Sequence, residues 1–296
     1  MTNANPLSDL SDRLADAVAR AAAALVVVKG RERLPATGIV IGSDLVLTAD
    51  HVLERDDDLS IVTADGRALA ATLLGRDPST DLALLRVAEL NGQAIRTATP
   101  RVGALALAVG RPGSDGPQAS LGVIGAVSGP LRTPQGSVER VLRVDATPYP
   151  GFSGGALIDS TGAAYALFTT GLALGTPLGV PMDLALAIAD QLRQHGAPRR
   201  GYLGIVSQPA RLTAAHATLA GQDRGLLIAK VEDGSPAEKA GLLMGDTLLA
   251  LGDVVTRDAD ALMVALRGDR VGKTVAARVL RAGAIANVNV EIGQRP

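Results

Sequence analysis

The chain of 296 residues contains no cysteine and no tryptophan, and only 2% of its residues are aromatic. The absence of cysteine excludes disulfides, thiolate catalysis and cysteine-ligated zinc. Because aromatic side chains are so few, buried cores have to be built from Val, Leu, Ile and Ala, and the hydrophobic share of 47% supplies ample material for them. The length of the chain fits two domains better than one.

An excess of charge of one sign is also missing. The 29 basic and 30 acidic side chains leave a formal charge of −1, so the charge balance gives no reason to expect binding to nucleic acid or to an anionic membrane surface. The three histidines, His51, His195 and His216, lie far apart without the spacing of metal ligands. We therefore expect neither a metal site nor a cofactor.

Long hydrophobic runs are absent as well. The longest one, residues 21–28, is too short to cross a bilayer, so no transmembrane segment is expected. The first nine residues show neither the basic region nor the apolar region of a signal peptide. The sequence as it stands therefore predicts a cytoplasmic protein, whereas a truncated N-terminus would leave an extracytoplasmic location open.

The hydrophobic periodicity changes near residue 25. Residues 1–24 form a predicted N-terminal helical segment, with a helix over 8–24 that Ser8 caps. Short Val, Ile and Leu runs between turn residues then follow one another, which is typical of an all-β sandwich or a pair of barrels. The expected strands cover 25–28, 38–41, 45–49, 59–62, 68–74, 82–87, 105–109, 122–127, 141–144, 156–158, 164–169 and 179–182. A helix is predicted over 183–194.

Residues 196–200, Gly-Ala-Pro-Arg-Arg, read as a linker. They separate a β-rich domain over 25–195 from a second domain over 201–296. In the second domain, a capping box at Ser235-Pro-Ala-Glu238 predicts the start of a helix. The other elements expected there are strands over 201–206, 225–231, 246–251, 273–281 and 284–292, with helices near 236–240 and 258–267.

The segment Pro150-Gly-Phe-Ser-Gly-Gly155 carries the strongest local signal for chemistry. A serine hydroxyl needs a base to become a good nucleophile, and a tetrahedral intermediate needs N–H groups aimed at its oxyanion. The glycines allow a tight turn around Ser153, so the N–H groups of Gly151 and Ser153 are candidates for the oxyanion hole. The alternative interpretation is a Gly-rich turn with an incidental serine.

His51 is the candidate base, because His195 lies in or beside the linker and His216 lies beyond it. It follows an apolar strand, where a lone histidine is more often a satisfied core residue. Asp81, just before another apolar strand, is the candidate partner that orients the imidazole. Asp77 is better described as a turn-capping residue. Asp50 is poorly placed to reach the ring, because neighbouring side chains on a strand point to opposite faces.

The order His, Asp, Ser along the chain is that of chymotrypsin, whereas subtilisins and α/β-hydrolases use other orders. The all-β pattern agrees with this order independently. Together they predict a mostly β, chymotrypsin-like double β-barrel protease domain.

The motifs together resemble the HtrA (high temperature requirement) family of serine proteases over roughly residues 10–292. Three segments are similar to the family's catalytic motifs, and three more resemble the loop before its activation loops and its PDZ domain. They are Thr48-Ala-Asp-His-Val52, Asp77-Pro-Ser-Thr-Asp-Leu-Ala83, Gly151-Phe-Ser-Gly-Gly-Ala156, Gly110-Arg-Pro112, Arg200-Gly-Tyr-Leu-Gly-Ile205 and Ser235-Pro-Ala-Glu-Lys-Ala-Gly241. The resemblance implies a homotrimer and an exported protein, although the N-terminus shows no export signal.

Phe152 departs from the family pattern, which usually has Asn between the glycine and the serine. This raises the alternative that Phe152 gates the oxyanion hole or holds the site inactive. By the same scaffold, the residue six before the nucleophile, Thr147, lies at the floor of the S1 pocket, with Phe168 and Thr169 on its wall. Since none of the three is acidic, we expect small or medium apolar residues at P1.

The PDZ resemblance implies that the second domain binds peptide C-termini by strand addition. Tyr202, Leu203, Gly204 and Ile205 would form the carboxylate-binding loop and the start of the strand. The far wall would come from the helix over 258–267, with Ala261, Leu262 and Ala265. The alternative is that this apolar stripe belongs only to the core.

The leading functional prediction is an ATP-independent serine endopeptidase that degrades misfolded or exposed polypeptide and binds peptide C-termini through the PDZ domain. The second is a catalytically gated or inactive chaperone, and the third is a PDZ adaptor with a β scaffold. An intact set of His51, Asp81 and Ser153 favours the first, and labelling of Ser153 by a fluorophosphonate distinguishes it from the others.

Overall fold

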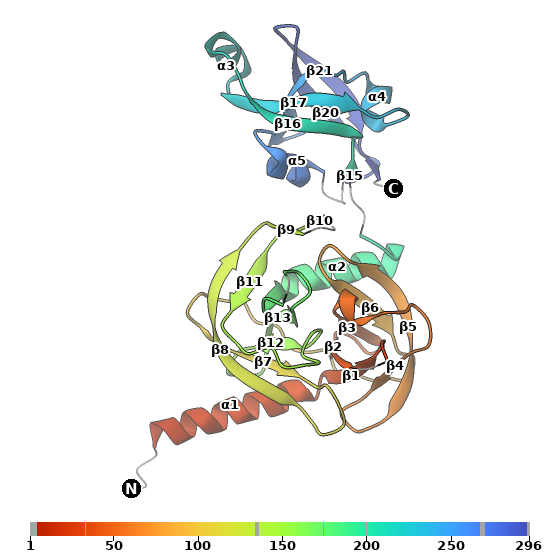
Figure 1. The fold of residues 1–296 in the computed structure, drawn as a ribbon, viewed down its shortest axis with the longest axis vertical. Helices are drawn as coiled ribbons and strands as arrows, with labels where there is room; N and C mark the ends of the chain where they lie inside the picture. Colours follow the sequence, from red (N-terminus) through yellow and green to blue (C-terminus); the bar gives the residue numbers. More distant parts are fainter. Residues whose placement is uncertain are drawn as a thin grey trace. The chain divides into compact units, whose positions relative to one another are not determined.

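The computed structural model describes residues 5–32, 34–133, 136–173, 175–198, 201–266 and 270–294. The chain divides into two compact units, Met1–Pro198 and Arg199–Pro296 (Figure 1). The division falls inside the expected linker, of which Arg199 and Arg200 lie outside the described residues.

The first unit opens with α1 (Pro6–Ala22). The side chain of Asn5 accepts the N–H of Leu7 at 3.1 Å, and Pro6 occupies the first turn. The prediction that Ser8 caps this helix was therefore wrong: Pro6 presets a helical φ, so the helix begins two residues before Ser8. Its Ala17 face packs against Gly162, where a Cβ would lie 2.8 Å from the Ala17 carbonyl oxygen.

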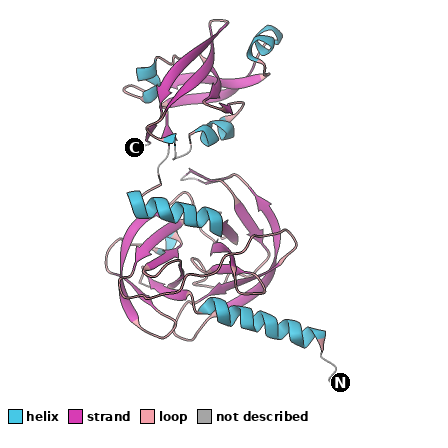
Figure 2. Ribbon diagram, turned by 180° about the vertical axis from the view of Figure 1, so that it is seen from behind, coloured by secondary structure: helices cyan, strands magenta, loops and turns pink. Residues whose placement is uncertain are grey.

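A closed six-stranded barrel follows (Figure 2). Its antiparallel strands are in the order β1-β2-β3-β6-β5-β4. Its strands are β1 (Leu25–Lys29), β2 (Ala36–Val40), β3 (Leu45–Thr48), β4 (Leu59–Val62), β5 (Ala68–Asp77) and β6 (Leu82–Arg86). Between β3 and β4, the 3-10 turn η1 (Asp50–Val52) leaves the barrel wall. Val46, Leu47 and Leu84 are fully buried, so Val and Leu fill this core in the near-absence of aromatic residues.

The second closed barrel has the order β11-β14-β13-β12-β7-β8. Its strands are β7 (Leu105–Gly110), β8 (Gln118–Ser128), β11 (Val141–Val144), β12 (Ala156–Ile158), β13 (Ala164–Thr169) and β14 (Leu178–Pro181). A small hairpin of β9 (Leu131–Thr133) and β10 (Gly136–Val138) was not predicted. The unit ends with α2 (Met182–His195), which stops at Gly196 in the left-handed region with φ 74°. The predicted double β-barrel is confirmed.

The second unit contains a main sheet in the order β16-β17-β18-β20-β21, with β19 paired to β18, and a short pair of β15 and β22. The elements are β15 (Gly201–Tyr202), β16 (Ile205–Arg211), α3 (Ala214–Ala220), β17 (Arg224–Val231), α4 (Pro236–Ala240), β18 (Thr247–Leu251), β19 (Val254–Val255), α5 (Ala259–Ala265), β20 (Thr274–Arg281), β21 (Ala284–Glu291) and β22 (Gly293–Gln294). The single strand expected over 201–206 is two strands, because Gly204 turns the chain with φ 77°.

Each unit has its own hydrophobic core. In the second unit, Leu226, Leu248 and Val279 are fully buried and belong to one cluster. The predicted cap of α4 is confirmed, since the Ser235 side chain accepts the N–H of Glu238 at 3.2 Å. Within the part of the chain that the structure describes, no helix is long and apolar enough to cross a membrane.

Candidate active site

His51 lies in η1, three residues beyond the end of β3, so it follows a strand as the sequence predicts, but in a 3-10 turn that was not predicted. The 3-10 turn lifts its side chain out of the barrel wall, where it remains 34% exposed. The carboxylate of Asp50 turns the other way and pairs with Arg76. The expectation that Asp50 does not reach the ring therefore agrees with the structure, but the physical reason is the turn and this ion pair.

Asp81 lies in the turn between β5 and β6, with φ 56°, and is 4% exposed. Its carboxylate accepts the backbone N–H of His51 at 2.9 Å, and its two oxygens lie 3.0 and 2.8 Å from His51 Nδ1. Because an ionised carboxylate only accepts hydrogen bonds, Nδ1 carries the proton in this contact. Nε2 is then left with its lone pair, as a general base requires.

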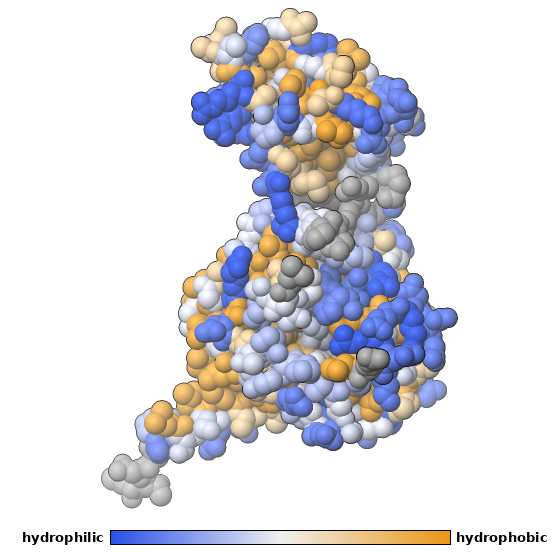
Figure 3. Space-filling model, viewed as in Figure 1, coloured by the Kyte–Doolittle hydropathy of each residue, from blue (hydrophilic) through white to orange (hydrophobic). Residues whose placement is uncertain are grey.

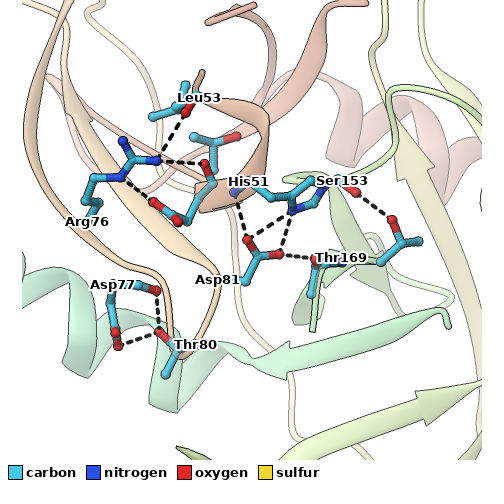
Figure 4. A network of polar contacts seen from close by, with 12 residues as sticks. His51, Leu53, Arg76, Asp77, Thr80, Asp81, Ser153 and Thr169 are labelled. Atoms are coloured by element: carbon cyan, nitrogen blue, oxygen red, sulfur yellow. Dashed lines mark hydrogen bonds and ion pairs between the residues drawn. The ribbon is translucent and has the colours of Figure 1, made fainter. Parts of the chain in front are cut away.

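The loop before Asp81 is held by Asp77, whose carboxylate accepts the Ser79 N–H at 3.1 Å, the Ser79 hydroxyl at 2.8 Å and the Thr80 hydroxyl at 2.7 Å. The turn-capping interpretation of Asp77 is thus confirmed. Figure 4 shows this second aspartate apart from the imidazole, with Asp81 directed at the ring.

Thr169 contributes another donor to Asp81. Its side chain is fully buried and its hydroxyl donates to Asp81 Oδ2 (Figure 4). The N–H of Gly171 donates in turn to the Thr169 hydroxyl oxygen at 2.9 Å. A Cβ on Gly171 would lie 2.4 Å from His51 Nδ1 and 2.5 Å from Asp81 Oδ2, so only glycine leaves room for the pair.

Ser153 follows β11 and precedes β12, and it is 8% exposed. Its Oγ lies 3.3 Å from Oγ1 of Thr170, the residue directly after β13. Figure 4 shows Ser153 beside the His51 ring, on the side away from Asp81. The hydrogen bond of the serine hydroxyl is therefore made to Thr170, a residue that the sequence analysis did not single out.

The chain before Ser153 forms a tight turn. The N–H of Phe152 donates to the Tyr149 carbonyl at 3.1 Å, with Pro150 and Gly151 as the central residues and φ 83° at Gly151. Pro followed by a glycine with positive φ is the signature of a type II turn. Among the described residues, neither the Gly151 N–H nor the Ser153 N–H donates to a backbone or side-chain acceptor.

Thr37 on β2 holds this turn through two hydrogen bonds. Its hydroxyl donates to the Gly151 carbonyl at 2.7 Å, and its N–H donates to the Ser153 carbonyl at 3.2 Å. The N–H of Arg111 donates to the same hydroxyl at 2.8 Å. The Phe152 carbonyl, which shares a peptide plane with the Ser153 N–H, accepts the Gly155 N–H at 2.8 Å, so in this trans peptide the Ser153 N–H points the opposite way. Nothing in the local sequence around Thr37 indicated its contact with Gly151, because it joins the two barrels.

Phe152 is 1% exposed and packs edge-on against Tyr149 and Phe168, at centroid distances of 5.3 and 6.4 Å. The ring belongs to the core of the second barrel. It therefore fills the barrel interior, where its burial stabilises the turn, and does not stand free in the oxyanion loop.

A pocket of about 460 Å³ opens at Ser153. The described residues that line it are Arg31, Leu34, His51, Pro148, Tyr149, Pro150, Gly151, Phe152, Ser153, Phe168, Thr170 and Gly175. Of the predicted S1 residues, Phe168 lies at this pocket. Thr147 does not line it: its side chain is exposed and its carbonyl accepts the Ser120 hydroxyl at 2.7 Å. Thr169 does not line it either, because its hydroxyl is turned to Asp81.

A larger groove, of about 820 Å³, lies elsewhere on the same unit. It is lined by Arg20, Val40 and Leu90 among others and shares no residue with the pocket at Ser153. The smaller pocket is the candidate site, because it alone of the two contains His51 and Ser153. The structure shows no group of three His, Cys, Asp or Glu side chains, within its described ranges, that could hold a metal ion.

In the second unit, the carbonyls of Leu203 and Gly204 accept the N–H groups of Ala237 and Glu232, both at 2.8 Å. The Tyr202 hydroxyl donates to the Glu232 carboxylate. A Cβ on Gly204 would lie 2.2 Å from the Ser235 Cβ, which explains the glycine.

Of the predicted groove residues beyond this loop, Ile205 begins the edge strand β16 and is half-buried. On α5, Leu262 and Ala265 are buried in the core, and only Ala261 is half-exposed. The core interpretation of the stripe therefore applies to Leu262 and Ala265.

Two family descriptions match the chain. Residues 36–167 match the trypsin-like peptidase domain, and residues 201–292 match the PDZ domain. A curated relative from Halomonas elongata, called a probable periplasmic serine endoprotease DegP-like, is 33% identical over 271 residues. That alignment covers 88% of this chain and 56% of the relative, so the chain spans about half the length of the curated relatives it matches.

Solved structures match over nearly the whole chain. The HtrA-type protease AlgW with a tripeptide is 30% identical with a TM-score of 0.79, covering 96% of this chain and 97% of that one. The serine endoprotease from Yersinia pestis is 27% identical with a TM-score of 0.78, covering 96% and 98%. The two barrels, the PDZ unit and these relatives together show that the chain belongs to the HtrA-type serine proteases.

Proposed function

We propose that this chain is a serine endopeptidase in which Ser153 is the nucleophile, His51 the general base and Asp81 the residue that orients the base. The observation that carries the proposal is the contact of His51 Nδ1 with both oxygens of a 4%-exposed Asp81, at 3.0 and 2.8 Å, in the same pocket as Ser153. A buried acceptor on Nδ1 holds the tautomer whose Nε2 takes a proton.

In the acylation step, the Ser153 Oγ proton passes to His51 Nε2 while Oγ bonds to the scissile carbonyl carbon. The carbonyl oxygen becomes an oxyanion, and the N–H groups of Gly151 and Ser153 stabilise it. His51 then gives the proton to the leaving amine, and the C–N bond breaks. Water repeats the sequence on the acyl-enzyme and releases the acid, which restores Ser153.

The bond between Ser153 and Thr170 fits this scheme as a resting contact. At 3.3 Å it is long for two hydroxyls, so it costs little to break. A rotation about the Ser153 Cα–Cβ bond turns Oγ from Thr170 towards His51, and catalytic hydrogen bonds often tighten only with substrate bound.

The proposed substrates are misfolded or unfolded polypeptides, with the second unit binding their C-termini. β16 lies at the edge of its sheet, and Gly204, directly before it, packs closely against Ser235. An exposed edge of this kind accepts a peptide as an added strand. The AlgW structure named above contains a tripeptide, and another structure of AlgW contains a decapeptide.

For the assembly we propose a homotrimer. The first unit exposes large apolar side chains, among them Leu10 on α1 and Leu121 and Val123 on β8. Figure 3 shows apolar surface beside α1 on the face that it draws. Light scattering after gel filtration tests the trimer, and Leu121→Asp should shift the mass to that of a monomer.

The name of the Halomonas relative includes the word periplasmic. We propose an extracytoplasmic site of action for this chain too, which cell fractionation of the native source tests. Recovery only from the cytosolic fraction would instead support the expectation drawn from the N-terminal residues.

Fluorophosphonate labelling tests the enzyme proposal directly. We expect labelling of wild-type chain at Ser153, identified by peptide mass mapping, and no labelling of Ser153→Ala or of His51→Ala. A wild-type chain that binds unfolded clients but is never labelled would favour the inactive chaperone instead.

A further inference from the structure

The guanidinium of Arg76, on β5, reaches the turn η1 that carries His51 (Figure 4). Nε donates to Asp50 Oδ1 at 2.5 Å, and Nη2 donates to the carbonyls of Asp50 and Leu53 at 3.3 and 3.1 Å. Nη1 donates to Asp56 Oδ1 at 2.6 Å. Every hydrogen bond of this side chain therefore ends on the segment that enters and leaves His51.

The base of the Arg76 side chain is itself fixed. Its N–H donates to the Gly196 carbonyl at 3.2 Å, at the end of α2, and it pairs with Ala83 on β6. A Cβ on the preceding Gly75 would lie 2.2 Å from the Gly196 carbonyl oxygen, so the two backbones are in close contact there. The guanidinium thus extends from a rigid part of the barrel, as a support for a precise site requires.

The turn η1 is anchored by its fully buried Val52 side chain and, just after it, by the Glu54 N–H, which donates to the Gly30 carbonyl at 3.0 Å, but it has few polar contacts at His51 itself. Its N-cap residue, Ala49, offers no side-chain hydrogen bond, and the Asp50 N–H donates to the Asp81 carbonyl at 3.1 Å. Asp81 therefore holds the turn on one side and Arg76 holds it on the other. A single 3-10 turn of three residues is only marginally stable by itself, so contacts from outside the turn have to fix the orientation of η1.

We propose that Arg76 is a positioning residue, which holds η1 so that His51 Nε2 faces Ser153. This role rests on the proposed function, since it requires His51 to be the base. Arg76 touches neither the imidazole nor Ser153 and acts through Asp50 and the backbone of the turn. It also supplies the counter-charge for Asp50, which is 7% exposed and lies close to Asp81.

The test is the rate constant of fluorophosphonate acylation at Ser153, which reports chemistry without the peptide-binding unit. Arg76→Ala should lower it about 30- to 100-fold, the cost of a misplaced catalytic group. Arg76→Lys should recover part of the loss, and added guanidinium ion should recover part of it in Arg76→Ala. The matched control is Arg86→Ala on β6, whose exposed pair with Asp44 at 3.5 Å lies outside this network, with a rate equal to wild type.

A purely stabilising role would lower the melting temperature without rescue by guanidinium and without a change in the rate of the folded fraction, and that result would overturn the proposal. The low-field proton resonance of His51 Nδ1–H should broaden or shift in Arg76→Ala. If Arg76→Ala does not fold, Asp50→Asn removes the charged acceptor of Arg76 Nε. An unchanged acylation rate in that variant would overturn the proposal. Labelling that persists in His51→Ala would instead refute the proposed function.

Pro209 lies in the middle of β16, and its position bears on which peptides the second unit can bind. The antiparallel ladder of β16 with β17 runs unbroken through Gln208↔Leu227, Pro209↔Leu226 and Ala210↔Gly225. N–H groups in such a ladder point alternately to the partner strand and away from it. A proline has no N–H, so it fits a ladder without breaking it only where that N–H would face the open edge.

We infer that Pro209 ends strand addition on β16, so that the groove reads about four C-terminal residues of a peptide. An added strand beside Gly204 finds outward N–H groups at alternate residues, such as Ile205 and Ser207. At Pro209 it finds a carbonyl but no donor. This limit rests on the proposed binding of C-termini along β16. The class of partner is a polypeptide with a free, short and accessible C-terminal tail.

Fluorescence anisotropy with an array-selected octapeptide and its own C-terminal tetrapeptide tests this limit. Wild type should bind the two within about twofold, whereas Pro209→Ala should bind the octapeptide about fivefold more tightly than the tetrapeptide, the value of one added hydrogen bond. A wild-type preference of about tenfold for the octapeptide, lost when its fifth residue from the C-terminus is N-methylated, would overturn the limit. Absence of binding by either peptide would refute C-terminal recognition itself.

Discussion

Each unit buries one aspartate against one arginine, and the two pairs differ in quality. In the second unit, Asp246 is 2% exposed and accepts Arg281 Nε and Nη2 on its two oxygens, at 2.8 and 2.7 Å. The Leu243 N–H adds a third bond at 2.9 Å. In the first unit, the Asp50 carboxylate accepts from Arg76 through Nε alone, and Arg76 Nη1 donates to Asp56.

The electrostatic consequence has opposite signs. Burial raises the pKa of Asp50 above its usual range, the charges of Asp81 and Asp77 add to the rise, and Arg76 does not cancel it. Burial also acts to raise the pKa of Asp246, but the Arg281 and Leu243 hydrogen bonds outweigh it and hold that pKa below the usual range. The pair beside His51 therefore holds a turn at some electrostatic cost, whereas the bidentate pair in the second unit stabilises its fold.

The largest expected effect separates chemistry from stability in the first unit. Ser153→Ala and His51→Ala should each lower casein hydrolysis on the order of a million-fold, because removing one member of such a set removes nearly all of its effect. Ser153→Ala removes only a 3.3 Å contact with Thr170, so its thermal transition should stay within about 2 °C of wild type. Residual turnover near the wild-type level in either variant would show that the roles are assigned to the wrong residues.

Much of this site was predictable because the chemistry resides in short segments. His51, Asp81 and Ser153 each follow or precede an apolar run, and their order along the chain indicated the scaffold. The residues that complete the site act over long sequence separations. Thr169 reaches Asp81 from 88 positions away, and Thr37 reaches Gly151 from 114.

The fold divides in the same way. Short, mostly apolar strands set off by turn residues, such as β4 and β12, have the bounds that the pattern predicts. The turn η1 and the hairpin of β9 and β10 were missed, because tertiary contacts and not periodicity produce them. The pKa of Asp50 also depends on Arg76, 26 residues away, and no local pattern shows that pairing.

The second prediction concerns the stability of the PDZ unit. Arg281→Ala leaves the Asp246 carboxylate buried without its bidentate partner and should cost about 2 kcal/mol in the free energy of unfolding, less than the roughly 3–5 kcal/mol of a fully buried pair because Arg281 is 33% exposed. Hydrogen exchange of the second unit, followed by mass spectrometry, measures the loss. The rate of Ser153 labelling should not change.

Arg224→Ala is the matched control for that variant. Arg224 is exposed on β17 and lies 4.0 Å from Asp223, so its removal should cost less than about 0.5 kcal/mol. Equal losses in the two variants would mean that the bidentate geometry at Asp246 carries no special stability, which would remove the contrast between the two units.

The third prediction concerns the P1 specificity of the first unit, and it follows from the residues that line the pocket at Ser153. No Asp or Glu occurs among the described residues that line the pocket at Ser153, whereas Tyr149 and Phe168 contribute apolar surface. We expect cleavage after Val, Ala, Leu and Ile, with discrimination among them of only about 1–2 kcal/mol, since one methylene changes binding little. Mass-spectrometric mapping of cuts in a denatured protein checks it. A dominant preference for Lys or Arg would require an acid to reach the pocket.

The smallest expected effect tests the two aspartates against each other. A pKa held below the ordinary 3.8 means that the unfolded chain binds more protons. The stability that Asp246 contributes is therefore present above about pH 4 and is lost as the pH falls through its folded pKa. Asp50 has the opposite sign: its folded pKa lies above 3.8, so the free energy of unfolding falls as the pH rises through that range.

Urea titrations at a series of pH values, with each unit followed by its own amide resonances, compare Asp246→Asn with Asp50→Asn. At neutral pH, Asp246→Asn should destabilise its unit more than Asp50→Asn destabilises the other, because only the Asp246 pKa is held below its usual range. The difference should shrink below about pH 4, where both carboxyls take up protons. An equal cost at neutral pH, or a difference that grows on acidification, would contradict the opposite signs of the two shifts.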